Sequence, residues 1–265
     1  MSSSLTLFLL KLALVAASIL GATLAARRWG HAASGLLGGM PMIIGPITAV
    51  LLVDQSAERV RDILLATLQS QPAMLMHILA FAYAARRWSW PLCLLVANGV
   101  YLALALLLTR IDLAPAAAVT VVALAWWTAL RVMPRHDTSV PAARVQVPRS
   151  ELWWRLAAAL GVAGGVIQGA SSMPAAWGGV LLAAPITGNV LPAFTLPRHG
   201  PAATVQLLRG FVHGQLGFAS FVTSMVLLLP LLHPAVAWTM AVVAATLAPW
   251  LNGLRRRRGA AAAGA

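Results

Sequence analysis

The sequence predicts an all-α polytopic membrane protein with about nine transmembrane helices, and two observations support this fold class. Of the 265 residues, 60% are hydrophobic and only 9% are charged, whereas roughly a quarter of the residues in a soluble domain are charged. The hydrophobic residues also form successive runs of about 20 residues, the length that a helix needs to cross the hydrocarbon core. The composition therefore excludes a soluble domain, and the single cysteine, Cys93, excludes a disulfide-stapled secreted fold.

Nine spans follow one another along the chain. We place them at about 5–26, 34–53, 60–85, 90–109, 113–133, 152–170, 176–196, 203–230 and 232–253. The first span has an alternative interpretation as a signal peptide, because Ala22 and Ala26 offer small residues near a cleavage point. Arg27 and Arg28 follow it at once, and they oppose translocation of the chain beyond them. The proline-containing segment 133–150 is the one internal linker.

The net charge of +13 divides unevenly between the two faces of such a bundle. Loops on one face carry most of the arginines, including the run 255–258, whereas loops on the other face are nearly neutral. Because basic loops stay in the cytoplasm, we expect a bacterial inner (plasma) membrane protein with its N-terminus outside and its C-terminus inside. The charge lies in short clusters between apolar runs, so the expected partner is the lipid bilayer and not a nucleic acid. Homo-oligomer formation stays open.

An internal repeat divides the chain into two halves. The second span reads GGMPMIIGPITAVL and the seventh reads GGVLLAAPITGNVL, and a cation, Lys11 or Arg155, lies early in the first helix of each half. A single additional span between the halves reverses the orientation of the second half in the membrane. This arrangement predicts the inverted repeats of secondary transporters. The expected units are a first four-helix repeat at 1–110, a connecting span and cytoplasmic loop at 111–151, a second, inverted four-helix repeat at 152–254 and a basic cytoplasmic tail at 255–265.

Each half resembles the GlpM-like family of small four-helix bacterial inner-membrane proteins. The resemblance rests on the early cation and on the Gly-x-x-x-x-Pro region of the second span, where Lys11, Pro41 and Pro46 match best. The chain then looks like a tandem copy whose second half departs from the pattern at Arg155 and Val180. The resemblance implies a membrane fold, and it supplies no biochemical activity that could be transferred to this chain.

Prolines and small polar side chains mark the middle of the second and seventh spans. Pro46 and Pro185 each remove a backbone donor, which either breaks the helix and exposes half-helix ends to a ligand or merely bends the helix for packing. Because the N-termini of half-helices attract anions, a broken helix would suit a small anionic or polar substrate. The residues expected to bind it are Pro46, Thr48, Gln71, Pro185, Thr187, Asn189, Gln215, Lys11 and Arg155.

Lys11 and Arg155 have two interpretations. By default their heads snorkel to the nearest membrane surface, and the alternative is that they turn inwards and pair with an anionic substrate. His77 and His213 are more typical of hydrogen bonds across helices than of proton carriers. Glycines four residues apart predict close approach between helices. They are Gly161, Gly165 and Gly169 in one span and Gly210 and Gly214 in another.

The leading functional hypothesis is a permease or exporter of a small anionic or polar metabolite that works by alternating access. The alternative is a non-transporting membrane accessory protein of an envelope polysaccharide or lipid pathway, followed by an intramembrane enzyme and a channel or scramblase. The chain has no clustered aspartates, no His-Glu-x-x-His and no Gly-x-Ser-x-Gly, so we expect no enzymatic activity, no metal and no cofactor. No acidic residue is expected near the membrane centre, which disfavours ion coupling through a buried carboxylate.

Overall fold

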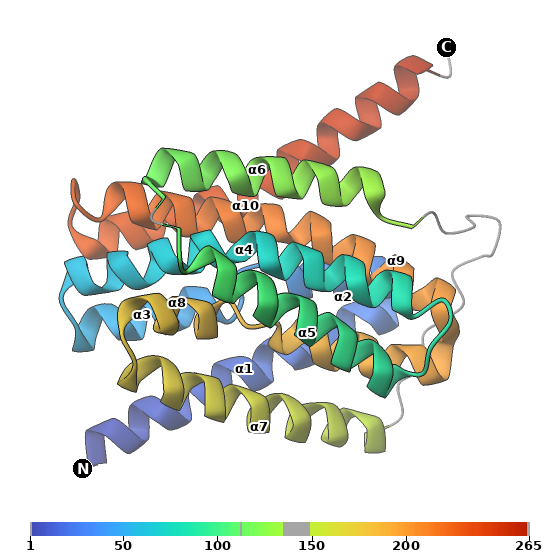
Figure 1. Ribbon diagram of the computed structural model, residues 1–265, viewed down its shortest axis with the longest axis horizontal. Coiled ribbons are helices and arrows are strands. Elements are labelled where there is room, and N and C mark those ends of the chain that lie inside the picture. Colours follow the sequence, from blue (N-terminus) through green and yellow to red (C-terminus); the bar gives the residue numbers. More distant parts are fainter. Residues whose placement is uncertain (1, 112, 135–148, 264–265) are drawn as a thin grey trace.

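The computed structural model describes residues 2–111, 113–134 and 149–263, and every regular element in these ranges is an α-helix (Figure 1). The elements are α1 (Ser2–Trp29), α2 (His31–Gly39), α3 (Ile44–Asp54), α4 (Ala57–Ala84), α5 (Trp90–Leu108), α6 (Pro115–Val132), α7 (Arg149–Ser172), α8 (Ala175–Leu182), α9 (Ile186–Leu228) and α10 (Pro234–Ala263). The all-α prediction is therefore confirmed over the described residues.

Seven segments of these described ranges are long and apolar enough to cross a membrane. They are Phe8–Trp29, His31–Val53, Ala57–Ala84, Trp90–Leu108, Pro115–Val132, Ala176–Leu228 and Pro234–Gly253. The predicted spans 176–196 and 203–230 both lie in the 53-residue segment, and the predicted span 152–170 corresponds to α7, which is not one of the seven. The apolar helices fit a membrane-embedded protein.

Local sequence explains where several helices begin. Ser56 caps α4, because its hydroxyl accepts the main-chain N–H of Arg59 at 3.3 Å. Proline occupies the first turn of α5 and α6, where its missing N–H costs nothing. Gly30, between α1 and α2, has a φ of 85°, and Gly200, where α9 bends sharply, has a φ of 77°. Both corners need the left-handed backbone that glycine alone adopts readily.

Two helices that the sequence predicts as single spans are interrupted. The chain leaves helical geometry between α2 and α3, in a segment that contains Pro41, and again between α8 and α9, just before Ile186. Pro185 is the N-cap residue of α9, and Pro46 lies in the first turn of α3. Each interruption therefore precedes a half-helix that begins next to a proline.

The half-helices pack closely on the long helices through glycines. A Cβ atom at Gly35 of α2 would come within 2.8 Å of the main-chain N of Phe211, and one at Gly179 of α8 within 2.6 Å of the main-chain N of Thr67. Gly210 and Gly214 of α9 lie equally close to the main chain of α2, as their spacing predicts.

The same prediction is wrong for two glycines of α7. A Cβ atom at Gly161 or Gly165 would meet no atom within 4 Å in the part of the chain that the structure describes, because this face of α7 does not lie against a neighbouring helix there. The side-chain surroundings of Gly169 are outside the described residues. Spacing alone therefore identified the close contact at α9 and not the open face of α7.

Different helices begin and end at the two ends of the bundle. In Figure 1, α4 and α6 end and α5 and α7 begin at the same end, whereas α1 begins at the opposite end. The helix α10 leaves the bundle at the end where α4 and α6 finish. Arginines mark that end in sequence, namely Arg86 and Arg87 after α4 and Arg131 in the last turn of α6.

Candidate functional site at the helix interruptions

A polar layer separates two apolar clusters in the core. On α4, buried residues 60–68 belong to one cluster and residues 73–85 belong to the other. On α9, residues 221–229 and 205–212 divide in the same way. Gln71 lies between the clusters on α4, and Gln215 lies between them on α9.

The two glutamines are hydrogen-bonded to each other. The Nε2 of Gln71 donates to the main-chain oxygen of Gln215 at 3.1 Å and to its Oε1 at 3.2 Å. The Nε2 of Gln215 donates to the main-chain oxygen of Gly39, at the end of α2, at 3.3 Å. Both side chains are at most 2% exposed, and the Oε1 of Gln71 has no hydrogen-bond partner among the described residues. A buried acceptor is thus left available for a ligand.

A small cavity lies beside this pair. Its volume is about 40 Å³, and residues from both interruptions line it, including Met40, Ala183 and Thr187 as well as the two glutamines. Since a water molecule needs roughly 10–15 Å³ of such space, the cavity has room for only a few water-sized groups. The arrangement can hold a small polar group between four ends of half-helices.

The threonines of the two Pro-Ile-Thr segments differ in their surroundings. Thr187 lines the cavity, and its hydroxyl donates to the main-chain oxygen of Gly38 at 2.9 Å, which ties the start of α9 to the end of α2. Thr48 is fully buried in α3, but it is not among the residues that line this cavity. Its hydroxyl has no hydrogen-bond partner in the described ranges. The structure therefore brings Gln71, Gln215 and Thr187 together and leaves Thr48 apart.

Asn189 belongs to a second polar group next to the cavity. Its Oδ1 lies 2.9 Å from the Nε2 of His77 and accepts the Nδ2 of Asn98 at 3.0 Å. The Nδ2 of Asn189 in turn donates to the Oδ1 of Asn98 at 3.0 Å. This group joins α4, α5 and the first turn of α9, so the cross-helix hydrogen bond expected of His77 is present. Asn98 was not predicted.

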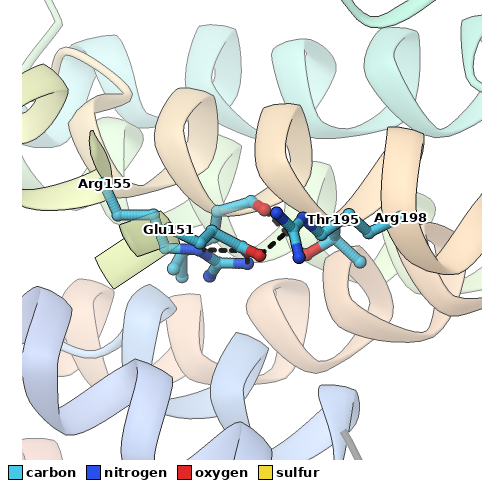
Figure 2. Close-up of polar contacts among 5 residues, drawn as sticks. Glu151, Arg155, Thr195 and Arg198 are labelled. Carbon is cyan, nitrogen blue, oxygen red and sulfur yellow. Dashed lines mark hydrogen bonds and ion pairs between the residues drawn. The ribbon is translucent and has the colours of Figure 1, made fainter. Parts of the chain in front are cut away.

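Arg155 is buried, so the prediction that it snorkels to the surface is wrong. Its side chain is 2% exposed, and its Nε and Nη2 donate to the Oε1 of Glu151 at 2.9 and 2.6 Å. The Nε of Arg198, from α9, lies 2.8 Å from the Oε2 of the same carboxylate. Figure 2 shows Glu151 between the two guanidinium groups. The carboxylate of Glu151, one helical turn earlier, offsets the free-energy cost of burying the Arg155 guanidinium, because a buried charge needs a partner of opposite charge.

Two histidines at the glycine corners contact each other. His31 directly follows Gly30, and His199 directly precedes Gly200. Their ring centroids are 4.8 Å apart, so α2 and α9 meet here as well as at the cavity. Sequence reasoning missed this contact, because residues that meet only in the tertiary fold leave no local spacing. The Glu151–Arg155 spacing of four residues was a signal that could have been used.

Lys11, the last of the predicted binding residues, has a side chain outside the described residues.

Comparisons with known protein families, curated proteins and solved structures find no match for this chain. The resemblance to GlpM-like proteins therefore stays a prediction.

Proposed function

We propose that the chain is a multi-pass inner-membrane transporter of a small anionic or polar metabolite, with nine spans arranged as two inverted four-helix repeats that alternate in access. The observation that carries the proposal is the meeting of two interrupted helices at one cavity, with Gln71 and Gln215 bonded across it. Interrupted helices of this kind bind substrates in secondary transporters.

A constant sequence offset supports the repeats. Gln71 and Gln215 are 144 residues apart. The same offset takes Lys11 to Arg155, Gly35 to Gly179 and Thr67 to Phe211. The close approach of Gly35 to Phe211 therefore has its counterpart in the approach of Gly179 to Thr67. A two-fold relationship between the halves would account for both contacts, and its axis would then pass through the glutamine pair.

The bent helix supports the count of nine spans. Gly200 divides α9 into a part that follows the interruption and a longer part that carries Gln215. In the first half, α3 and α4 are separate helices in the corresponding positions. The count is nine when α2 and α3 together form one span, α8 and the first part of α9 together form another, and α7 is also a span.

The chemistry of the site favours a polar ligand without a strong positive charge. The cavity lies at the N-terminus of α9. The main-chain N–H groups of the first helical turn give this end a partial positive charge. The Oε1 of Gln71 and the hydroxyl oxygen of Thr187 add two acceptors, because the Thr187 hydroxyl already donates its proton to the main-chain oxygen of Gly38. No carboxylate from the part of the chain that the structure describes lines the cavity. A metabolite needs more than 40 Å³, so loading requires the half-helices to move apart, as alternating access demands.

Flux measurements test the proposal. Proteoliposomes are loaded with radiolabelled phosphate, acetate, lactate or glutamate in turn, and uptake is measured against concentration. We expect saturable uptake of at least one probe, reduced about tenfold in Gln71→Met and in Thr187→Val, which corresponds to the loss of about one hydrogen bond. Gln69→Met is the matched control, because Gln69 is on the same helix but donates to the main-chain oxygen of Leu113.

Two outcomes would count against transport through this cavity. One is equal flux in the wild type, Gln71→Met and Thr187→Val. The other is no flux of any probe together with a stoichiometric protein partner in mild detergent, which would favour the accessory role.

A further inference from the structure

A second cavity lies on the outside of the bundle, in a groove between α2, α9 and α10. Its volume is about 430 Å³, and it shares no lining residue with the central cavity. Gln206, Arg209 and His213 line it from one face of α9, and Asn252 lines it from α10. The groove is therefore polar on one side. Only 17% of the apolar segment of α10 is buried within the protein, so α10 faces lipid.

Two independent landmarks place the groove at the headgroup level of the membrane. The apolar segment of α10 ends at Gly253, and Asn252 and Gly253 both line the groove. The apolar segment that contains α2 begins at His31, and the next two residues, Ala32 and Ala33, line the groove from the other side. One segment stops and another starts at this level. Both lie at the arginine-rich end of the bundle, because Arg27 and Arg28 close α1 just before α2 begins.

The charge in the groove is uncompensated within the described residues. Arg209 is half-buried, and it makes no hydrogen bond or ion pair with any residue that the structure describes. Among the described residues, no carboxylate lines the groove. An arginine in an apolar segment is costly unless an anion or the headgroup region satisfies it. The amides of Gln206 and Asn252 add neutral donors beside it.

We propose that this groove binds the phosphate headgroup of an anionic phospholipid, with Arg209 as the phosphate partner. Basic pockets between transmembrane helices at the cytoplasmic surface are suited to such headgroups. A guanidinium pairs with phosphate through two parallel hydrogen bonds. The apolar part of the groove, including Ala33, Leu36 and Pro249, lies beside the polar residues and can take the glycerol and the first acyl carbons. A lipid satisfies both parts, whereas free phosphate satisfies only the polar one.

Lipid retention in the purified full-length protein tests the proposal. The protein is delipidated in mild detergent and titrated with phosphatidylglycerol or with phosphatidylcholine, and bound lipids are counted by native mass spectrometry. We expect one phosphatidylglycerol to bind much more tightly than phosphatidylcholine. Arg209→Gln should weaken this binding about tenfold. Arg28→Gln is the matched control, because Arg28 is an exposed arginine at the same end of the bundle and does not line the groove.

Two further arms separate the alternatives. Ala33→Leu narrows the groove without changing its charge, so it should also weaken phosphatidylglycerol binding, and Arg209→Lys should restore part of what Arg209→Gln loses. Inorganic phosphate at millimolar concentration should not displace the lipid. Unchanged binding in Arg209→Gln and Ala33→Leu would overturn the proposal, and displacement by inorganic phosphate would assign the groove to a soluble anion.

Discussion

Gln71 of α4 and Gln215 of α9 are hydrogen-bonded to each other at the level where the two apolar clusters meet. The amide of Gln71 donates to both oxygens of Gln215, and the amide of Gln215 continues to the end of α2. The pair is nearly inaccessible, and a second side-chain hydrogen bond between α4 and the long part of α9 runs from the Nε of Arg61 to the main-chain oxygen of Val226 at 3.2 Å. We therefore expect this contact to contribute to stability and, in the proposed function, to transport.

A double-mutant cycle measures the coupling within the pair. Gln71→Leu should lower the free energy of unfolding by about 1 kcal/mol, because it leaves the Oε1 of Gln215 without the donor that it has in the native fold. Adding Gln215→Leu should cost less than the sum of the single changes, with a coupling energy of roughly 0.6–1.7 kcal/mol. Unfolding by denaturing detergent provides the measurement, and Gln69→Leu is the control, expected to show no coupling with Gln215→Leu. Strict additivity of the Gln71 and Gln215 changes would contradict the contact.

The glycine contacts between α2 and α9 give a stability prediction with a matched control. A Cβ atom at Gly214 would overlap the main chain of Leu36 and Gly39, and main chain cannot move aside as a side chain does. Gly214→Ala should therefore lower the free energy of unfolding by about 1–3 kcal/mol. Gly165→Ala, on the open face of α7, should be neutral or slightly stabilising, because alanine favours a helix. Equal effects of the two substitutions on the melting temperature would be inconsistent with this packing.

The sequence predicted the helical class and marked the prolines near which two spans are interrupted, because apolar length and proline act locally, but it left open whether these prolines break or only bend the helix. It could not predict which polar residues meet. Asn98 and Asn189 pair across helices, and nothing in the spacing of either residue marks the partner. Arg155 was misjudged for a different reason, since the default assumes that an intramembrane arginine has only the membrane surface to satisfy it. Glu151, one helical turn earlier, supplies that satisfaction inside the fold.

The buried Glu151–Arg155 pair predicts a characteristic order of stabilities. Glu151→Gln leaves Arg155 buried without a counter-ion, which should cost about 3–5 kcal/mol. The double replacement Glu151→Gln with Arg155→Met removes both charges, so it should be more stable than Glu151→Gln alone. Melting temperatures of the three proteins in the same detergent check the order. A double replacement that melts below the single one would mean that Arg155 has another partner.

The location of the two termini tests the inverted repeat most directly. The proposed nine spans put the N-terminus and the C-terminus on opposite sides of the membrane, and the arginines after α4, in the last turn of α6 and at 255–258 within α10 lead us to expect the C-terminus in the cytoplasm. Green fluorescent protein fused after residue 265 should therefore fluoresce, since it matures only in the cytoplasm, whereas alkaline phosphatase fused there should be inactive. A fusion within residues 230–233, between α9 and α10, should give the reverse result and serves as the internal control. Two termini in the same compartment would require an even number of spans, which would contradict the proposed two-fold relationship between the halves.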